Sequence, residues 1–154
     1  MTEVVIEPFR PELAETFKNL NVEWLQKYFV VEPHDEELLQ KCEETIIKKG
    51  GFIFFAMVNN KAVGTFAFIK LENKIFELGK MAVSPEYQGL KIGQKLLDFA
   101  IYFAEKHHWK KIILYSNTKL ENAIYLYRKY GFTEIDLEKN TPYQRSNIKM
   151  ELVL

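Results

Sequence analysis

The chain has 154 residues, of which 47% are hydrophobic, so it can bury a sizeable core in a single domain spanning residues 1–154. Its 21 basic and 21 acidic residues balance, which argues against a protein that binds nucleic acid through a basic excess. The lone cysteine, Cys42, excludes an internal disulfide framework and fits a reducing cytoplasm, and neither a long apolar run nor an N-terminal leader predicts a membrane partner.

The first third of the chain predicts a short strand and two helices. The strand covers residues 4–7, and a helix follows that begins at about Pro11 and keeps its apolar residues at helical spacing as far as Tyr28. A second helix is expected from about Asp35, with Cys42 on its apolar face. We therefore expect Cys42 to be an inert core residue rather than a thiol nucleophile.

The middle of the chain predicts three consecutive strands. Residues 52–58 and 62–69 are rich in β-branched and aromatic side chains, and residues 59–60 between them are two asparagines. Asparagine tolerates the positive φ of a two-residue hairpin turn. A second turn around residues 72–74 leads into a third strand over residues 75–83.

In the second half of the chain, segments with the apolar spacing of a helix alternate with segments typical of a strand. A helix is expected from Gly93 to about His108, a strand over 111–116, a helix from about Thr118 to Tyr130, and an antiparallel pair of strands, 132–137 and 147–153. The predicted order is β-α-α-β-β-β-α-β-α-β-β. This order indicates an α+β fold with a mixed sheet.

The segment after strand 75–83 is typical of an anion site. Pro85 ends the strand, Gly89 and Gly93 bracket a loop, and a helix begins there. Free backbone amides and the positive end of a helix dipole favour a phosphate or pyrophosphate. Neither the three-glycine dinucleotide fingerprint nor the Walker loop is present, although a nucleotide-phosphate binder of another kind remains open.

Residues 83–93 resemble the pyrophosphate-binding motif of the GNAT superfamily of acyl-CoA-dependent N-acetyltransferases, Q/R-x-x-G-x-G/A. Gln88 and Gly93 match its first and last positions, and Gly89 is the usual second residue. Lys91 stands where the motif has its middle glycine. Lysine can offer its backbone amide there only if its dihedral angles allow the turn.

Residues 123–132 resemble the second GNAT signature, A-x-x-x-Y-x-x-x-G-F, with Tyr127 as its tyrosine. The two motifs and the element order together extend the resemblance over essentially the whole chain. Leu120 stands where many members have an asparagine that contacts CoA, so the resemblance leaves Asn117 or Asn122 to supply that amide.

The resemblance implies a GNAT-like, mostly antiparallel sheet flanked by helices and an acetyltransferase that uses acetyl-CoA as co-substrate and no metal. Strand residues 81–83 would hold the pantetheine arm, the amide of Met81 would polarise the acetyl carbonyl, and the loop amides would hold the pyrophosphate. The implied cofactor-binding residues are Met81, Ala82, Val83, Gln88, Gly89, Leu90, Lys91, Ile92, Gly93, Gln94, Asn117 and Asn122.

Two catalytic residues are implied. Tyr127 matches the general acid of the family, and its alternative is a core aromatic on an apolar helix face. Glu77 matches the glutamate base of some members, and because it lies four residues before Met81 we expect both on one face of the strand. The alternative for Glu77 is a charged residue on the exposed side of the strand.

The acceptor amine, a small molecule or a peptide, is less defined by the sequence. The acceptor pocket of this fold is usually shaped by the first two helices and the last hairpin, and Arg145 in that hairpin is expected either to bind a substrate carboxylate or to lie on the surface. A homodimer through exposed aromatics such as Tyr102 and Trp109 is also open. A catalytically silent CoA-binding sensor or interaction module is the alternative to an enzyme. The nominated acceptor residues are Trp24, Tyr28, Glu32, Tyr143 and Arg145.

Overall fold

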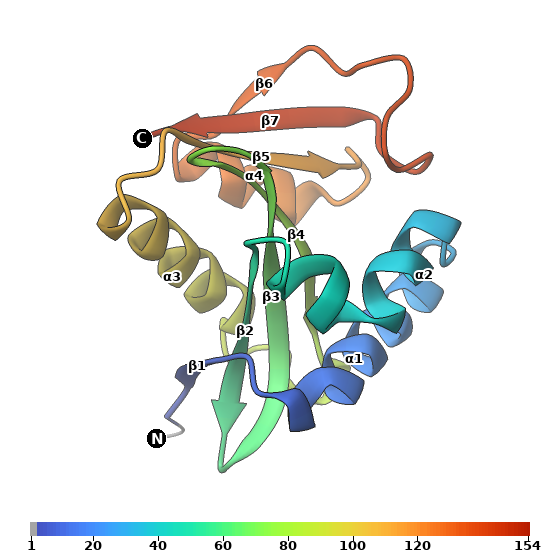
Figure 1. The fold of residues 1–154 in the computed structure, drawn as a ribbon, viewed down its shortest axis with the longest axis vertical. Coiled ribbons are helices and arrows are strands. Elements are labelled where there is room, and N and C mark those ends of the chain that lie inside the picture. Colours follow the sequence, from blue (N-terminus) through green and yellow to red (C-terminus); the bar gives the residue numbers. More distant parts are fainter. Residues whose placement is uncertain (1–2) are drawn as a thin grey trace.

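The computed structural model describes residues 3–154 (Figure 1), and residues 1 and 2 of the predicted domain lie outside this range. The strands of the described residues form one seven-stranded sheet. They are β1 (Val5–Pro8), β2 (Phe52–Val58), β3 (Lys61–Glu72), β4 (Ile75–Val83), β5 (Lys111–Ser116), β6 (Thr133–Ile135) and β7 (Ile148–Val153). Their spatial order is β1-β2-β3-β4-β5-β7-β6, and every neighbouring pair is antiparallel except β4 and β5. The predicted α+β fold with a mixed, mostly antiparallel sheet is confirmed.

The helices cover both faces of the sheet (Figure 1). Within the described residues they are α1 (Ala14–Tyr28), α2 (Pro33–Gln40), α3 (Ile92–Lys106) and α4 (Glu121–Lys129). Residues of α1 and α2 pack against one face in the α1-side core, which includes Phe17, Leu25 and Phe55. Residues of α3 and α4 pack against the other face in the α3-side core, which includes Phe66 and Leu96. None of these helices combines the length and apolar character that a membrane crossing needs.

The first two predicted helices are confirmed in place but not in extent. One turn of 3-10 helix, Pro11–Leu13, precedes α1. The second helix is interrupted: α2 ends at Gln40, Lys41 leaves the helical region with φ −133° and ψ 58°, and Glu43–Ile47 form a π-helical turn. Cys42 is 2% exposed, and burial raises the pKa of its thiol. The prediction that Cys42 is a buried core residue is confirmed.

The predicted turn between β2 and β3 is present in the structure. Val58 pairs with Lys61, so two asparagines form the turn, with φ of 50° and 65°. Positive φ at both positions is the type I′ geometry that matches the twist of a hairpin, so this prediction is confirmed.

Trp109, which was expected among the exposed aromatics, is buried and stacks on Phe76 with ring centroids 3.7 Å apart. Its ring therefore belongs to the core and is not available for a dimer contact.

A bulge in β4 changes which of its residues share a face. Lys80 has φ 52°, and the register of the pairing with β3 shifts by one residue around it. Leu78 packs in the α3-side core before the bulge, and Met81 packs against the same core after it. Glu77 lies on the opposite face from Leu78, so it does not share a face with Met81. That prediction is wrong because the extra residue breaks the alternation of the strand.

Candidate active site

A cleft opens where the parallel strands β4 and β5 separate. The two strands pair only over residues 75–77 and 111–113, and beyond them a cleft of about 550 Å³ lies between the strand ends. The starts of α3 and α4 and one side of α1 supply its other walls. Because no strand within residues 3–154 pairs with β4 on this side beyond Glu77, its backbone is open to an extended ligand that pairs like an added strand.

The loop before α3 leaves backbone amides at the edge of this cleft. Lys91, the residue before α3, has φ 56° and ψ 34°, the left-handed conformation that glycine adopts most easily. The lysine thus keeps the turn that the motif glycine would make. At Gly93, in the first turn of α3, an added Cβ would meet no heavy atom within 4 Å. Packing within residues 3–154 does not require a glycine there, so its missing side chain leaves room for a ligand beside the first amides of α3.

Replacing Lys91 with glycine is expected to raise the free energy of unfolding by about 0.5–1 kcal/mol. The left-handed conformation costs a residue with a Cβ about 1–2 kcal/mol, and the extra chain entropy that glycine loses on folding offsets about 0.5–1 kcal/mol of the gain. Urea denaturation followed by circular dichroism measures the difference. Lys95→Gly, at an exposed position inside α3, is the control and should lower the stability by about 1 kcal/mol. A loss of stability in both variants would contradict the strained conformation of Lys91.

The lining of the cleft is cationic. Lys80, Lys91 and Arg145 contribute to it, and within residues 3–154 no aspartate or glutamate does. The whole chain has no net charge, so this distribution is local. Lys80 and Arg145 pair with buried Asp35, so Lys91 and the free helix amides are the groups that suit an anionic ligand such as a phosphate or pyrophosphate.

Tyr127 lines the cleft from α4. Its ring packs against Phe132, with centroids 5.8 Å apart, and the side chain is only partly buried. Burial raises the pKa of the Tyr127 phenol to about 12. The hydroxyl is therefore protonated at neutral pH and can act as a proton donor in the cleft.

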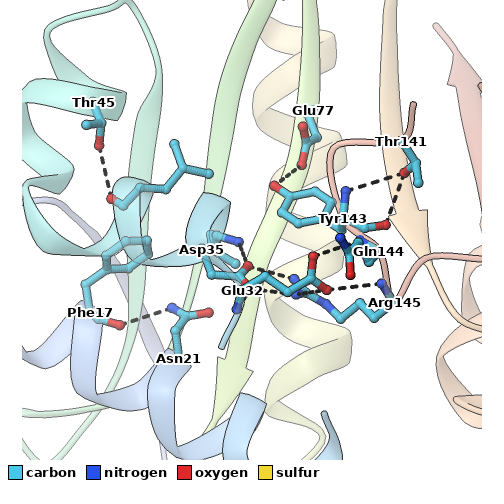
Figure 2. Close-up of polar contacts among 12 residues, drawn as sticks. Phe17, Asn21, Glu32, Asp35, Thr45, Glu77, Thr141, Tyr143, Gln144 and Arg145 are labelled. Carbon is cyan, nitrogen blue, oxygen red and sulfur yellow. Dashed lines mark hydrogen bonds and ion pairs between the residues drawn. The ribbon is translucent and has the colours of Figure 1, made fainter. Parts of the chain in front are cut away.

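Glu77 lies behind the cleft rather than in its lining. It is 4% exposed, and its carboxylate accepts a hydrogen bond from the hydroxyl of Tyr143 at 2.8 Å (Figure 2). Burial raises the pKa of Glu77, and the hydrogen bond from Tyr143 and the charge of Lys80 oppose this shift. The alternative of an exposed strand residue is therefore wrong, because α1 and α2 cover this face of β4.

A buried ion cluster joins α2, β4 and the segment before β7 (Figure 2). Asp35 is fully buried and accepts hydrogen bonds from Arg145 at 2.6 and 2.8 Å and from Lys80. Glu32 accepts hydrogen bonds from the backbone amides of Gln144 and Arg145 at 2.7 and 3.0 Å. The guanidinium of Arg145 is thus paired with carboxylates of the chain itself. It is neither a free fork for a substrate carboxylate nor a surface group.

The two cations hold Asp35 ionised. Burial alone would raise the pKa of Asp35, but the hydrogen bonds from Arg145 and the charge of Lys80 outweigh it and lower the pKa to about 2. Burial lowers the pKa of the Lys80 ammonium, which has Asp35 as its one hydrogen-bonded carboxylate within residues 3–154. Asp35 has two cationic partners, and it is therefore the centre of the cluster.

Most predicted site residues meet at this one cleft. Of the acceptor residues, Trp24 and Arg145 line it, whereas Tyr28, Glu32 and Tyr143 lie behind its lining. Leu90, nominated for the cofactor, is also outside the lining. The nominated cofactor residues that do line the cleft are Met81, Ala82, Val83, Gln88, Gly89, Lys91, Ile92, Gly93, Gln94, Asn117 and Asn122.

The two candidate asparagines differ in what their amides already bind. Nδ2 of Asn117 donates to the carbonyl of Arg145 at 2.8 Å, and its Oδ1 accepts from the amide of Lys119 at 2.9 Å. Both ends of the Asn117 side chain therefore fix the loop before α4. Asn122 lies in the first turn of α4 with an exposed side chain. Of the two, Asn122 has the amide that is free to meet a ligand.

Several residues of this region were not nominated from the sequence. Among them Asn21, Phe29 and Lys80 line the cleft, and Asp35 anchors the ion cluster, although only its place at a helix start was predicted. One signal was available: Glu77 and Lys80 are both charged in a strand that is otherwise apolar apart from its glycine, a pattern that favours buried pairing.

Known proteins share this fold and part of this sequence. A model of the acetyltransferase (GNAT) family matches residues 18–132. A GNAT-family acetyltransferase of Staphylococcus aureus Mu50 is 28% identical, with a TM-score of 0.84 over 97% of this chain and 98% of that chain. The PaiA N-acetyltransferase of Thermoplasma acidophilum, solved in complex with coenzyme A, shares the fold with a TM-score of 0.77 at 21% identity over 99% of both chains.

A curated relative gives a shorter match. An uncharacterized N-acetyltransferase of Dictyostelium discoideum is 35% identical over 63 residues, which are 41% of this chain and 29% of that protein. The match thus spans less than a third of that relative. The family match over residues 18–132 covers most of the chain and includes both sequence motifs, so the chain belongs to the acetyltransferase (GNAT) family.

Proposed function

We propose that the protein transfers an acetyl group from acetyl-CoA to a primary amine by direct transfer in a ternary complex. The observation that carries this proposal is the cleft between the separated ends of β4 and β5, which has Lys91 and free helix amides at its edge and, within residues 3–154, no carboxylate in its lining. Such a lining suits the pyrophosphate of an acyl-CoA. Membership of the acetyltransferase family supports the class of reaction.

The strand and the loop have separate tasks in this proposal. Residues 81–83 of β4 offer backbone hydrogen bonds to the pantetheine arm, and the amide of Met81 polarises the acetyl carbonyl. The amides of residues 88–94 hold the pyrophosphate beside the open space at Gly93. Acetyl-CoA supplies the acetyl group as an activated thioester.

Two side chains handle the protons. A primary amine has a pKa of roughly 10, so its ammonium form must lose a proton before it can attack. We assign this proton to Glu77, whose raised pKa makes its carboxylate a better acceptor, and because Glu77 lies behind the lining the proton reaches it through water. Tyr127 holds a proton at Oη and gives it to the departing thiolate, and the proton that the acetylated nitrogen loses restores the phenol.

Calorimetric titration of the purified protein with acetyl-CoA, CoA and ATP is the first test. The proposal expects saturable binding of acetyl-CoA and CoA and little response to ATP. A preference for ATP would favour a nucleotide-phosphate binder instead. Release of free thiol from acetyl-CoA in the presence of amines is the second test. Binding without any amine-dependent thiol release would identify a catalytically silent CoA-binding module.

Gly93→Leu is expected to change stability and cofactor binding in opposite directions. The φ of Gly93 is not in the left-handed region and an added Cβ meets no atom, so leucine should stabilise α3 by about 0.5 kcal/mol. The motif accepts alanine at this position, but the larger side chain of leucine would occupy the space beside the first amides of α3 and weaken acetyl-CoA binding about tenfold. Urea denaturation and calorimetry measure the two effects. Lys95→Leu, an exposed position of α3, is the control for both, and unchanged affinity in Gly93→Leu would place the pyrophosphate elsewhere.

A further inference from the structure

Asn21 is a buried polar side chain that the proposed chemistry does not yet use. It is 2% exposed and lines the cleft from the middle of α1. Its Nδ2 donates to the carbonyl of Phe17 at 3.0 Å, and Figure 2 shows the amide oxygen turned away from Phe17. The opposite orientation would bring two oxygens together, so the hydrogen bond to Phe17 fixes which atom faces outward.

The oxygen of Asn21 is left as an acceptor with no donor. Within residues 3–154, Oδ1 of Asn21 accepts no hydrogen bond, and no side-chain polar atom fully shielded from solvent lacks a partner. The small exposed surface of this side chain therefore includes Oδ1, and it faces the cleft that Asn21 lines. Within residues 3–154 no group donates to this oxygen, so a ligand that displaces water from this part of the cleft must itself supply the donor.

Two aromatic side chains line the same cleft on the side of α1. Trp24 and Phe29 line the cleft, with ring centroids 5.7 Å apart, and Leu25 lies between them in the sequence. Nζ of Lys119 lies 4.1 Å from the ring centroid of Phe29. This wall is apolar, and the cation beside it would repel a second positive charge on a ligand.

The three buried carboxylates behind this wall have partners within the chain. Glu32 and Asp35 accept hydrogen bonds from Arg145, and Glu77 accepts one from Tyr143. None of them lines the cleft. Within residues 3–154 the cleft lining therefore offers a polyamine no carboxylate for its several positive charges. An amine with one nitrogen and an apolar body has a single charge to neutralise and loses less by this absence.

We propose that Asn21 binds the acceptor amine through Oδ1 and that the acceptor is a monoamine with an aromatic or branched apolar body, held against Trp24 and Phe29. This inference rests on the proposed acetyltransferase function. An N–H of the amine donates to Oδ1, which satisfies the free acceptor, while the apolar body covers the aromatic wall. Because Asn21 is uncharged, it accepts a hydrogen bond from one amine nitrogen but offers no counter-charge to the further cations of a polyamine.

Two measurements test this inference, and the first of them does not depend on the reaction. The first is calorimetric binding of 2-phenylethylamine and of spermidine to the protein saturated with CoA, which carries no acetyl group to transfer. We expect 2-phenylethylamine to bind at least tenfold more tightly than spermidine. The second is kcat/KM for thiol release from acetyl-CoA with the same two amines and with an alanyl peptide. We expect the highest value for 2-phenylethylamine.

Two variants of Asn21 test whether this side chain binds the amine. Asn21→Leu keeps the branched shape of the side chain and removes the oxygen, and it should lower both binding and kcat/KM for 2-phenylethylamine about tenfold, with acetyl-CoA affinity unchanged. Asn21→Asp adds a carboxylate to the cleft, and it should raise the preference for spermidine over 2-phenylethylamine about tenfold. Asn19→Leu, at an exposed position of the same helix, is the matched control and should change neither.

The outcomes separate the two proposals. Tighter binding or faster acetylation of spermidine by the unaltered protein, or full affinity for 2-phenylethylamine in Asn21→Leu, would overturn the assignment of the acceptor. Binding of 2-phenylethylamine that depends on Asn21, with no thiol release for any amine, would support the amine site and overturn the enzymatic function. Absence of 2-phenylethylamine binding to the CoA-saturated protein would overturn the acceptor assignment even if another amine is acetylated.

Discussion

Replacing Tyr127 with phenylalanine is expected to lower kcat for amine-dependent thiol release about 100- to 10,000-fold, the usual range for loss of a general acid. The ring and its packing against Phe132 remain, so the variant should fold and bind acetyl-CoA with unchanged affinity. Steady-state kinetics and calorimetry on the same preparation separate the two effects. A loss of affinity equal to the loss of turnover would assign Tyr127 to binding instead.

The control for this variant is Tyr125→Phe. Tyr125 lies two residues earlier on α4 and is 70% exposed, so its hydroxyl faces solvent and its removal should leave kcat unchanged. The pH profile gives a second check. Because burial raises the pKa of Tyr127 to about 12, the phenol keeps its proton up to about pH 11. Any fall of kcat between pH 8 and 10 must then come from another group.

Asp35→Ala is expected to lower the free energy of unfolding by about 3–5 kcal/mol. Removing this carboxylate leaves Arg145 and Lys80 with less than their full counter-charge in a buried place, and the loss of one partner from a buried ion pair has this magnitude. Urea denaturation measures the change. Glu36→Ala, the neighbouring exposed position of α2, should change the stability by less than about 0.5 kcal/mol. Equal effects in the two variants would contradict the central place of Asp35.

The same cluster predicts how stability depends on pH. Asp35 has a pKa of about 2 in the folded protein against 3.8 for the unperturbed group, so the folded state binds this proton less readily than the unfolded state. The stabilisation is complete above about pH 4 and is lost as the pH falls through the folded-state pKa near 2. The shift corresponds to about 2 kcal/mol. Asp35→Ala should lack this part of the acid dependence.

The sequence was sufficient for the features that depend on local patterns. Helical and alternating periodicity predicted the order of elements, and the asparagine pair before Lys61 predicted its turn. The bulge at Lys80 could not be predicted, since it depends on the pairing of β4 with β3 rather than on either strand alone. For the same reason the shared face of Glu77 and Met81 was predicted wrongly.

The acceptor side shows a second limit. Periodicity assigns apolar residues to the buried face of α1, so it passes over Asn21, which the fold buries between Phe17 and Leu25. Arg145 and Asp35 are similar cases. Each is a common surface residue type, and only the packing of the segment before β7 against α2 brings the two together. Long-range pairs of this kind leave no local trace in a sequence.

The ion cluster has a consequence for the order of folding. Asp35 and Arg145 are separated by 110 positions, and Asp35 and Lys80 by 45, so the cluster closes long loops before it gains any interaction energy. Hairpins such as β2–β3 close over a few residues and can form first. Contacts that form after the rate-limiting step affect the unfolding rate and not the folding rate. The stability that Asp35→Ala loses should accordingly appear as faster unfolding, which makes this cluster a determinant of how long the folded molecule lasts.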